Sequence, residues 1–188
     1  MKSRLNKTLI TKSLLAVSLA ALLPMAGTAM AAEIAGGTVN FSGSVVTSAC
    51  AIGSSSSNVD VNLGQVRTAS LAVAGSEAST AKSFSVVLED CDTTVSTGVA
   101  LTFSGTPDVK DPGSLAVGSN GGTGTAQNVA IRLYDEQGSV VKLGEASSIT
   151  TLRNGVNTLN FSAKYYSPAG QATAGDASAV ATYTLTYS

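Results

Sequence analysis

Apolar and polar residues alternate along short stretches of this chain, a pattern typical of strands that bury one face and expose the other. The clearest stretch spans residues 37–46, where polar residues separate four positions on the apolar side: Val39, Phe41, Gly43 and Val45. We expect a strand over this stretch. No turn joins it to the following strand as a hairpin, so its pairing partner has to come from elsewhere.

Eight further strands are predicted by the same alternation, and turns that contain Gly, Pro or Asn separate them. They span residues 46–52, 59–63, 83–88, 99–103, 129–134, 140–143, 159–165 and 181–187. We expect loops over residues 108–124 and 168–176. The chain beyond residue 31 shows no helical periodicity of useful length, no internal repeat and no linker. The pattern therefore predicts one all-β sandwich with Greek-key connections.

The first 31 residues have the features of a secretory signal peptide. Four basic residues precede or flank the start of an apolar run over residues 14–23, and Ala29-Met30-Ala31 fits the small-residue pattern of a cleavage site. An uncleaved membrane anchor is the alternative, but the run is shorter than the roughly 20 residues that a spanning helix needs. We expect export and cleavage, which leaves a mature chain that starts at Ala32.

Removal of residues 1–31 changes the charge of the protein. The full chain has 11 basic and 12 acidic residues, and four of the basic ones lie in this segment, so the mature chain has 7 and 12 and a net charge of −5. It carries no basic patch for nucleic acid. The remaining 157 residues, rich in Ala, Ser, Thr, Val and Gly, are enough for one domain of strands and turns with its own core.

The sequence contains two cysteines, Cys50 and Cys91. An even number of cysteines in an exported chain predicts a disulfide, because the compartment is oxidising. Closing a loop of this length stabilises the fold by about 4 kcal/mol in the chain-entropy model. A metal site is disfavoured, since the chain has no histidine and only two thiols.

No catalytic constellation is present in the sequence, and we expect no enzymatic activity. Without histidine there is no Ser-His or Cys-His pair. The acidic run Glu89-Asp90-Cys91-Asp92 is interpreted as a solvated strand end, with a cation site as the alternative. The glycine-rich run over 118–124 lacks the Gly-Lys-Ser/Thr ending of a phosphate-binding loop. Tyr165-Tyr166 could stack on a sugar, but Tyr165 lies on the apolar face of its strand, which favours core packing.

The feature of the sequence that most suggests a function is a pair of terminal strands, at 37–46 and 181–187, without evident partners. An open sheet edge exposes backbone donors and acceptors to another chain. Two readings of the N-terminal strand follow. It completes its own fold, or it fills a groove in a neighbouring molecule.

Several motifs along the chain together resemble those of chaperone–usher fimbrial subunits (pilins), most closely the type 1 fimbrial major subunits. They are Val39-x-Phe41-x-Gly43-x-Val45-Val46 before Cys50, Leu63-Gly64-Gln65-Val66-Arg67-Thr68, Asp90-Cys91-Asp92, Asn154-Gly155-Val156-Asn157, Phe161-Ser162-Ala163-Lys164-Tyr165, Gly175 and the penultimate Tyr187. Each motif is weak alone. The set spans essentially the whole mature chain and agrees with export and one disulfide.

The resemblance implies an incomplete immunoglobulin-like Greek-key sandwich that lacks its final strand and is completed by a donor strand from another subunit. Residues 1–31 would then be the signal peptide, 32–46 a donor-strand extension and 47–188 the pilin domain. In the extension, Val39, Phe41 and Val45 would enter the groove of a neighbouring subunit, with Gly43 where the groove is shallow. Such strand addition is a general mode of recognition for which pilins are a known example.

The resemblance also implies partners and a location. A periplasmic chaperone would lend a strand to the groove and contact the C-terminal strand through Gly175, Tyr183, Leu185 and Tyr187, and an outer-membrane usher would exchange that strand for the extension of the next subunit. The expected function is that of a structural subunit of an extracellular fimbria, supporting adhesion to surfaces or host cells. The alternative is a minor adaptor or a tip-associated adhesive subunit. No cofactor, nucleic acid or small-molecule substrate is expected.

Overall fold

A computed structural model of the 188-residue chain describes residues 36–118 and 124–188. The expected signal peptide lies outside the described residues. The chain divides into two units, residues 1–43 and residues 44–188. In the first unit, residues 36–43 are extended and form no strand. Among the described residues, no helix has the length and apolar character needed to cross a membrane.

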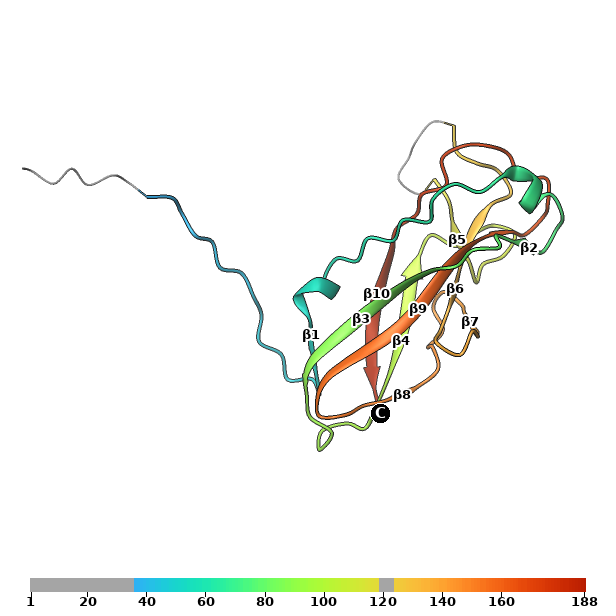
Figure 1. Ribbon diagram of the computed structural model, residues 1–188. Helices are drawn as coiled ribbons and strands as arrows, with labels where there is room; N and C mark the ends of the chain where they lie inside the picture. The colour runs from blue at the N-terminus through green and yellow to red at the C-terminus, as the bar shows by residue number, and fades with distance from the viewer. Residues whose placement is uncertain (1–35, 119–123) are drawn as a thin grey trace, which may run out of the picture. The chain divides into compact units, whose positions relative to one another are not determined.

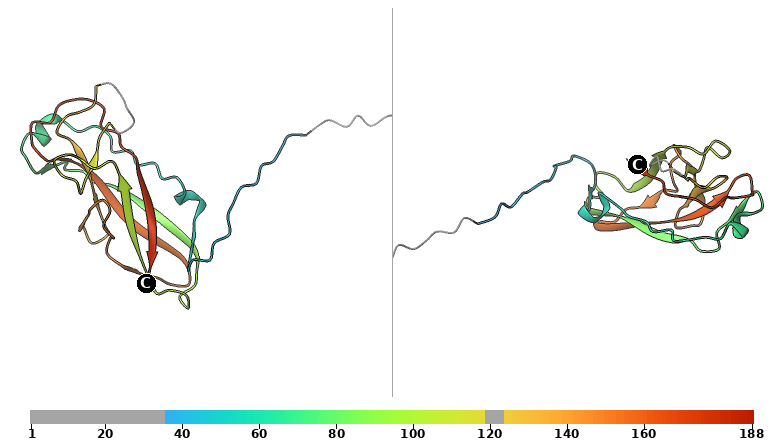
Figure 2. Two further views of the ribbon diagram at one scale, coloured as in Figure 1. Left: turned by 180° about the vertical axis from the view of Figure 1, so that it is seen from behind. Right: turned by 90° about the horizontal axis from the view of Figure 1, so that it is seen from above.

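The second unit is built from two antiparallel sheets (Figures 1 and 2). In hydrogen-bonded order, the larger contains β1 (Ala51–Ile52), β3 (Lys82–Cys91), β9 (Gly155–Ser167), β6 (Ala130–Tyr134) and β5 (Leu115–Ala116), with β2 (Ser76–Glu77) on β9 and β7 (Val140–Val141) on β6. The smaller contains β10 (Ala181–Tyr187), β4 (Gly98–Gly105) and β8 (Thr150–Thr151). Two 3₁₀ turns, η1 (Ser54–Ser56) and η2 (Thr68–Leu71), lie in the segment between β1 and β2.

The core lies between the sheets and is filled by alternate residues of the long strands. It includes Val86 and Leu88 from β3, Val99, Leu101 and Phe103 from β4, Ile131 and Leu133 from β6, and Leu159 and Phe161 from β9. The rings of Phe84, Phe103 and Phe161 pack with centroids 5.1–6.1 Å apart. The all-β sandwich and the buried faces expected for these strands are confirmed.

Three of the expected strands near the N-terminus differ in the structure. Residues 37–46 form no strand, and the strand expected over 46–52 is reduced to β1. Residues 59–63 are also without strand pairing, although Val59, Val61 and Leu63 are half-buried and the residues between them are exposed, as the alternation indicates. The side-chain pattern is that of a strand, but a strand also needs a hydrogen-bonded neighbour, and these segments have none in the described part of the chain.

Three short strands were absent from the expected set. β2 lies between the strands expected at 59–63 and 83–88, β5 lies inside the stretch expected to be loop, and β8 precedes β9. Each has two residues and is defined by pairing with β9, β6 or β4, respectively. A two-residue ladder is too short to leave a periodic signal, so distant pairing alone creates it.

Candidate functional site

An open groove runs along the edge of β10 that does not pair with β4. Two hollows of about 780 Å³ and 630 Å³ form it. They share walls at Val61, Leu63, Ile131 and Ala179, so they are continuous. One flank is β10 with the residues before it, and the other is the extended segment of residues 57–66.

The floor of the larger hollow is the hydrophobic core itself. It is lined by Phe84, Val86, Phe103 and Leu133, among other residues. Val86, Phe103 and Leu133 belong to the buried core, and Phe84 packs against it half-buried. The sandwich therefore presents apolar surface to the outside along one line between its sheets, where a further strand would cover it.

Both flanks of the groove have free backbone groups. β10 pairs on one edge with β4 and has no strand on its other edge within the described residues. In the described structure, residues 58–66 make no backbone–backbone hydrogen bond. Backbone N–H and C=O groups at such edges are available to an added strand, which gives the groove the chemistry of a strand acceptor.

The two ends of the groove are closed in different ways. At one end, the hydroxyl groups of Tyr183 and Tyr187 donate to the backbone carbonyl oxygens of Ser56 (2.6 Å) and Cys50 (3.4 Å). Burial raises the pKa of Tyr183, which keeps this hydroxyl protonated as a donor. At the other end, the link is made by backbone groups, with Gln171 N donating to Ala72 O at 2.9 Å.

The residues expected in the C-terminal strand fall in two places. Tyr183, Leu185 and Tyr187 lie on the half-buried face of β10. Gly175 does not belong to this strand but to the loop before it, where a Cβ would overlap with the backbone of residues 124–126. Its lack of a side chain allows the loop to pack closely at the wall of the smaller hollow.

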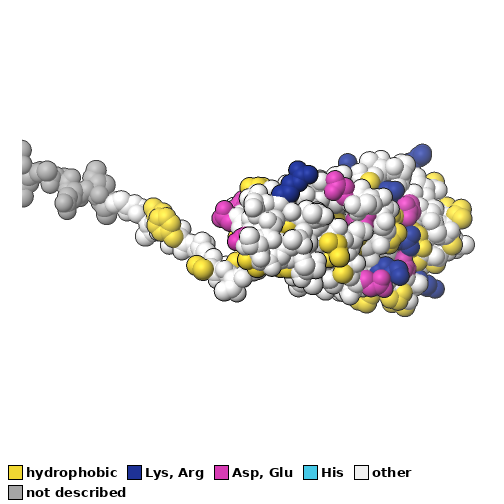
Figure 3. Space-filling model, turned by 90° about the horizontal axis from the view of Figure 1, so that it is seen from below, with side chains coloured by type: hydrophobic (Ala, Val, Ile, Leu, Met, Phe, Trp, Pro, Cys, Tyr) yellow, Lys and Arg dark blue, Asp and Glu magenta, His cyan; other side chains and the backbone are white. Residues whose placement is uncertain are grey.

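The residues expected to form the donor strand are exposed. The exposed fractions are 74% for Val39, 93% for Phe41 and 101% for Val45. Apart from the adjacent residues, no described atom lies within 4 Å of the Cβ position that a side chain at Gly43 would occupy. Figure 3 shows hydrophobic side chains along this extended N-terminal segment. Large apolar side chains exposed in an alternating row represent surface that association with a partner would bury.

The expected disulfide between Cys50 and Cys91 is present. It joins the residue before β1 to the end of β3, and both cysteines are buried. The backbone bond from Asp92 N to Ala49 O, at 2.9 Å, lies beside it. The disulfide therefore attaches the chain to the larger sheet. The attached point is just before the segment that becomes the groove flank.

The acidic run around Cys91 lies at a bulged strand end. The register of β3 against β9 shifts between Leu88 and Cys91, and Asp90 has a positive φ of 51°. The side chain and the backbone N–H of Thr94 donate to Asp92, which lowers the pKa of this carboxyl. No group of three His, Cys, Asp or Glu side chains suited to a metal ion occurs within the described ranges.

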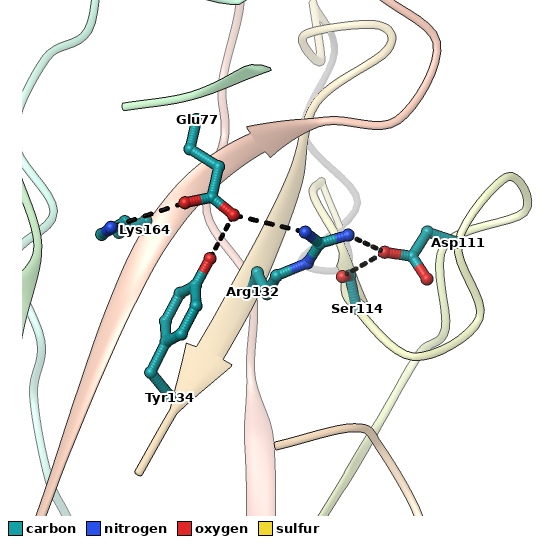
Figure 4. Close-up of polar contacts among 6 residues, drawn as sticks. All are labelled: Glu77, Asp111, Ser114, Arg132, Tyr134 and Lys164. Carbon is teal, nitrogen blue, oxygen red and sulfur yellow. Dashed lines mark hydrogen bonds and ion pairs between the residues drawn. The ribbon is translucent and has the colours of Figure 1, made fainter. Parts of the chain in front are cut away.

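A polar network on the outer face of the larger sheet was not expected from the sequence (Figure 4). Arg132 bonds to Asp111 at 2.7 Å and to Glu77 at 3.3 Å, and Lys164 lies 3.4 Å from the second Glu77 oxygen. The Tyr134 hydroxyl donates to Glu77 as well. The one available signal in the sequence was a basic residue, Arg132 or Lys164, on the outward face of each of two strands. The register of β6 and β9 places these two residues opposite each other. Their acidic partners lie far away in sequence.

This network makes the stability of the fold depend on pH. Partial burial raises the pKa of Glu77, but hydrogen bonds from Tyr134 and Lys164 and the nearby positive charges outweigh it, so the pKa lies below 4.5. Burial likewise raises the pKa of Asp111, and bonds from Arg132 and Ser114 bring it below 3.8. Because both values are lowered in the folded state, their contribution is complete above the unfolded pKa values and is lost as pH falls through the folded ones.

We therefore expect Glu77→Gln to lower the free energy of unfolding by about 1–2 kcal/mol at pH 7, since charge-assisted bonds of a partly exposed group are lost. The difference from the wild type should shrink below about pH 4. Urea unfolding at a series of pH values measures this. Glu145→Gln is the control, because Glu145 pairs with Lys142 on an exposed surface and should have little effect. An equal loss in both variants, or a Glu77 effect independent of pH, would contradict the role of the network.

Comparison with known proteins agrees with these features. Residues 39–188 match the family model described as fimbrial protein. The chain is 44% identical to the type-1 fimbrial protein A chain of Escherichia coli, over 96% of this chain and 98% of the relative. It is 42% identical to the fimbrial subunit type 1 of Klebsiella pneumoniae, over 96% and 98%.

Solved structures show the same architecture. A chain from the structure of a chaperone–usher pilus superposes with a TM-score of 0.68 at 28% identity, covering 82% of this chain and 96% of that one. The P pilus rod subunit PapA superposes with a TM-score of 0.61 at 28% identity, covering 75% and 100%. These neighbours agree with an immunoglobulin-like sandwich. The match across nearly all of the region after the expected signal peptide shows that this chain belongs to the fimbrial protein family.

Proposed function

We propose that this chain is the repeating structural subunit of an extracellular fimbria, in which residues 37–46 of one copy fill the groove of the next. The observation that carries this proposal is the match between two parts of one molecule. One part is a groove with an apolar floor and two free backbone edges. The other is an exposed, extended segment with apolar residues at every second position. As a member of the fimbrial family, the chain is a structural pilin and not an enzyme.

The energetics support strand donation between copies. Burying Val39, Phe41 and Val45 contributes about 5–9 kcal/mol at about 1.5–3 kcal/mol for each side chain, before the cost of ordering the segment. Backbone hydrogen bonds to both flanks add to this. Gly43 lets the strand approach where the groove has no room for a side chain. Because the donating and accepting surfaces differ, the contact does not close on itself and generates a filament.

The proposal includes a periplasmic chaperone and an outer-membrane usher. A subunit with an exposed apolar groove would associate nonspecifically before assembly. A partner that lends a strand would cover the groove and prevent this association. The free edge of β10, with Tyr183, Leu185 and Tyr187 half-buried on one face, is the surface for that contact. The usher would then exchange the lent strand for the extension of the incoming subunit. The filament would support adhesion to surfaces or host cells.

Electron microscopy of cells with and without this gene tests the function. Deletion should remove the whole fimbrial shaft, and a plasmid copy should restore it. Gold-labelled antibodies against the subunit should decorate the shaft along its length. Labelling confined to the tip, with shafts persisting in the deletion strain, would contradict the proposal and support a minor adaptor or tip-associated role.

A further inference from the structure

Ser56 connects the two sheets at one end of the groove. Its Oγ accepts a hydrogen bond from Val87 N of β3 at 2.7 Å, and its carbonyl oxygen accepts one from the Tyr183 hydroxyl of β10 at 2.6 Å. Ser56 is 1% exposed and closes the turn η1, which is itself attached to β3 by the bond from Gly53 N to Val87 O. We call this pair of bonds the Ser56 bridge.

The bridge stands at the start of the least attached part of the groove flank. Beyond it, residues 58–66 make no backbone–backbone hydrogen bond in the described structure. The far end of the same segment is held by backbone bonds, including that from Gln171 to Ala72. Tyr183 also lines the larger hollow and packs on Phe103, with ring centroids 6.4 Å apart. One side-chain hydroxyl thus connects β10 to the turn from which the opposite flank begins.

We propose that Tyr183 is a positioning residue that, through the Ser56 bridge, holds the groove at the width of one missing strand before a donor arrives. The inference rests on the proposed strand donation. Neighbouring strands lie about 4.8 Å apart, so the edges on either side of a missing strand must be held roughly 10 Å apart. A flank already fixed at that spacing does not have to be ordered during insertion, which favours faster association and tighter binding.

A peptide with the sequence of residues 37–46 tests the proposal on the full-length subunit. Every subunit in the experiment carries Gly43→Asn, so that copies cannot fill one another's grooves, while the peptide keeps Gly43. Association and dissociation rates of labelled peptide are then measured for this background and for added Tyr183→Phe. Loss of one hydroxyl bond should weaken binding about two- to tenfold, mainly through slower association.

Two further variants distinguish positioning from general stability. Ser56→Ala removes the other half of the bridge, so its effect on association should not multiply with that of Tyr183→Phe; the double variant should resemble the stronger single one. Tyr134→Phe is the matched control. It removes a tyrosine hydroxyl bond to Glu77 on the outer face of the larger sheet, and Tyr134 lines neither hollow of the groove. It should lower the unfolding temperature without changing the peptide rates.

The possible outcomes distinguish a failure of the Ser56 bridge from a failure of the proposed strand donation. Slower association in Tyr183→Phe and Ser56→Ala, with no change in Tyr134→Phe, supports the bridge. Equal rates in Tyr183→Phe and its background, or independent multiplying effects in the double variant, overturn it and leave strand donation standing. Absence of peptide binding to a folded subunit with an unaltered groove overturns strand donation, and the inference with it.

Discussion

Replacing Gly43 by Asn is expected to abolish fimbriae while leaving the subunit folded. In the isolated subunit, no described atom beyond the adjacent residues lies within 4 Å of the Cβ position at Gly43, so a side chain there has room in its own fold. In the groove of a neighbour, the larger polar side chain would meet an apolar floor without a hydrogen-bond partner. Electron microscopy should show few or no fibres, and the soluble subunit should keep the unfolding temperature of the wild type.

Ser42→Asn is the matched control for this prediction. It places the same side chain one residue earlier, on the opposite face of an extended segment, where it would point away from the groove. We expect fimbriae of normal length and number. Normal fimbriae from the Gly43→Asn variant would contradict the assignment of residues 37–46 as the donor strand. Loss of fimbriae in both variants would show that the face on which the added side chain lies does not determine assembly.

Removing the disulfide is expected to have the largest effect on stability. Cys50 and Cys91 are separated by 41 positions, and the chain-entropy model assigns about 4 kcal/mol to closing such a loop. The local structure also predicts a loss of stability, because the chain that follows Cys50 is otherwise attached to β3, within the described residues, only by the two residues of β1 and by hydrogen bonds of Gly53 and Ser56 to Val87. Changing both cysteines to Ala should lower the free energy of unfolding by about this amount, as measured by urea unfolding.

The reduced wild-type protein provides the control. It should unfold at nearly the same urea concentration as the double Ala variant, since both lack the cross-link and neither introduces a bulky group. Donor-peptide binding should weaken in both, because the turn η1 and the groove flank follow directly after β1. A loss of less than about 1 kcal/mol would show that the ladder and core hold this segment without the disulfide.

The strands of the core were predictable because their signal is local. In β3, Phe84, Val86 and Leu88 recur at every second residue, and the pleat of any strand places such residues on one face. The same rule identified β4, β9 and β10. It failed for 59–63 in an instructive way: the alternation predicted the burial of Val59, Val61 and Leu63 correctly but not the absence of pairing.

The groove was partly predictable. The sequence predicted two terminal strands without evident partners, and the family resemblance connected them. In the structure, the C-terminal strand pairs with β4 on one edge and has no strand on the other within the described residues. The contacts that shape the site were not predictable. Tyr183 and Ser56 are 127 residues apart, and Arg132 and Glu77 are 55 residues apart. Periodicity within a short window carries no information about pairs at such distances.

The sequence by itself determined the all-β class, the faces of the long strands and the unattached apolar row from Val39 to Val45. These depend on short-range alternation. Only the tertiary structure decided that residues 58–66 lie opposite β10 with no strand between them among the described residues, and that Tyr183 joins the two flanks through Ser56. The physical reason is that sheet pairing and groove shape are set by hydrogen bonds between distant segments, whereas burial of a strand face follows from the alternation of its own side chains.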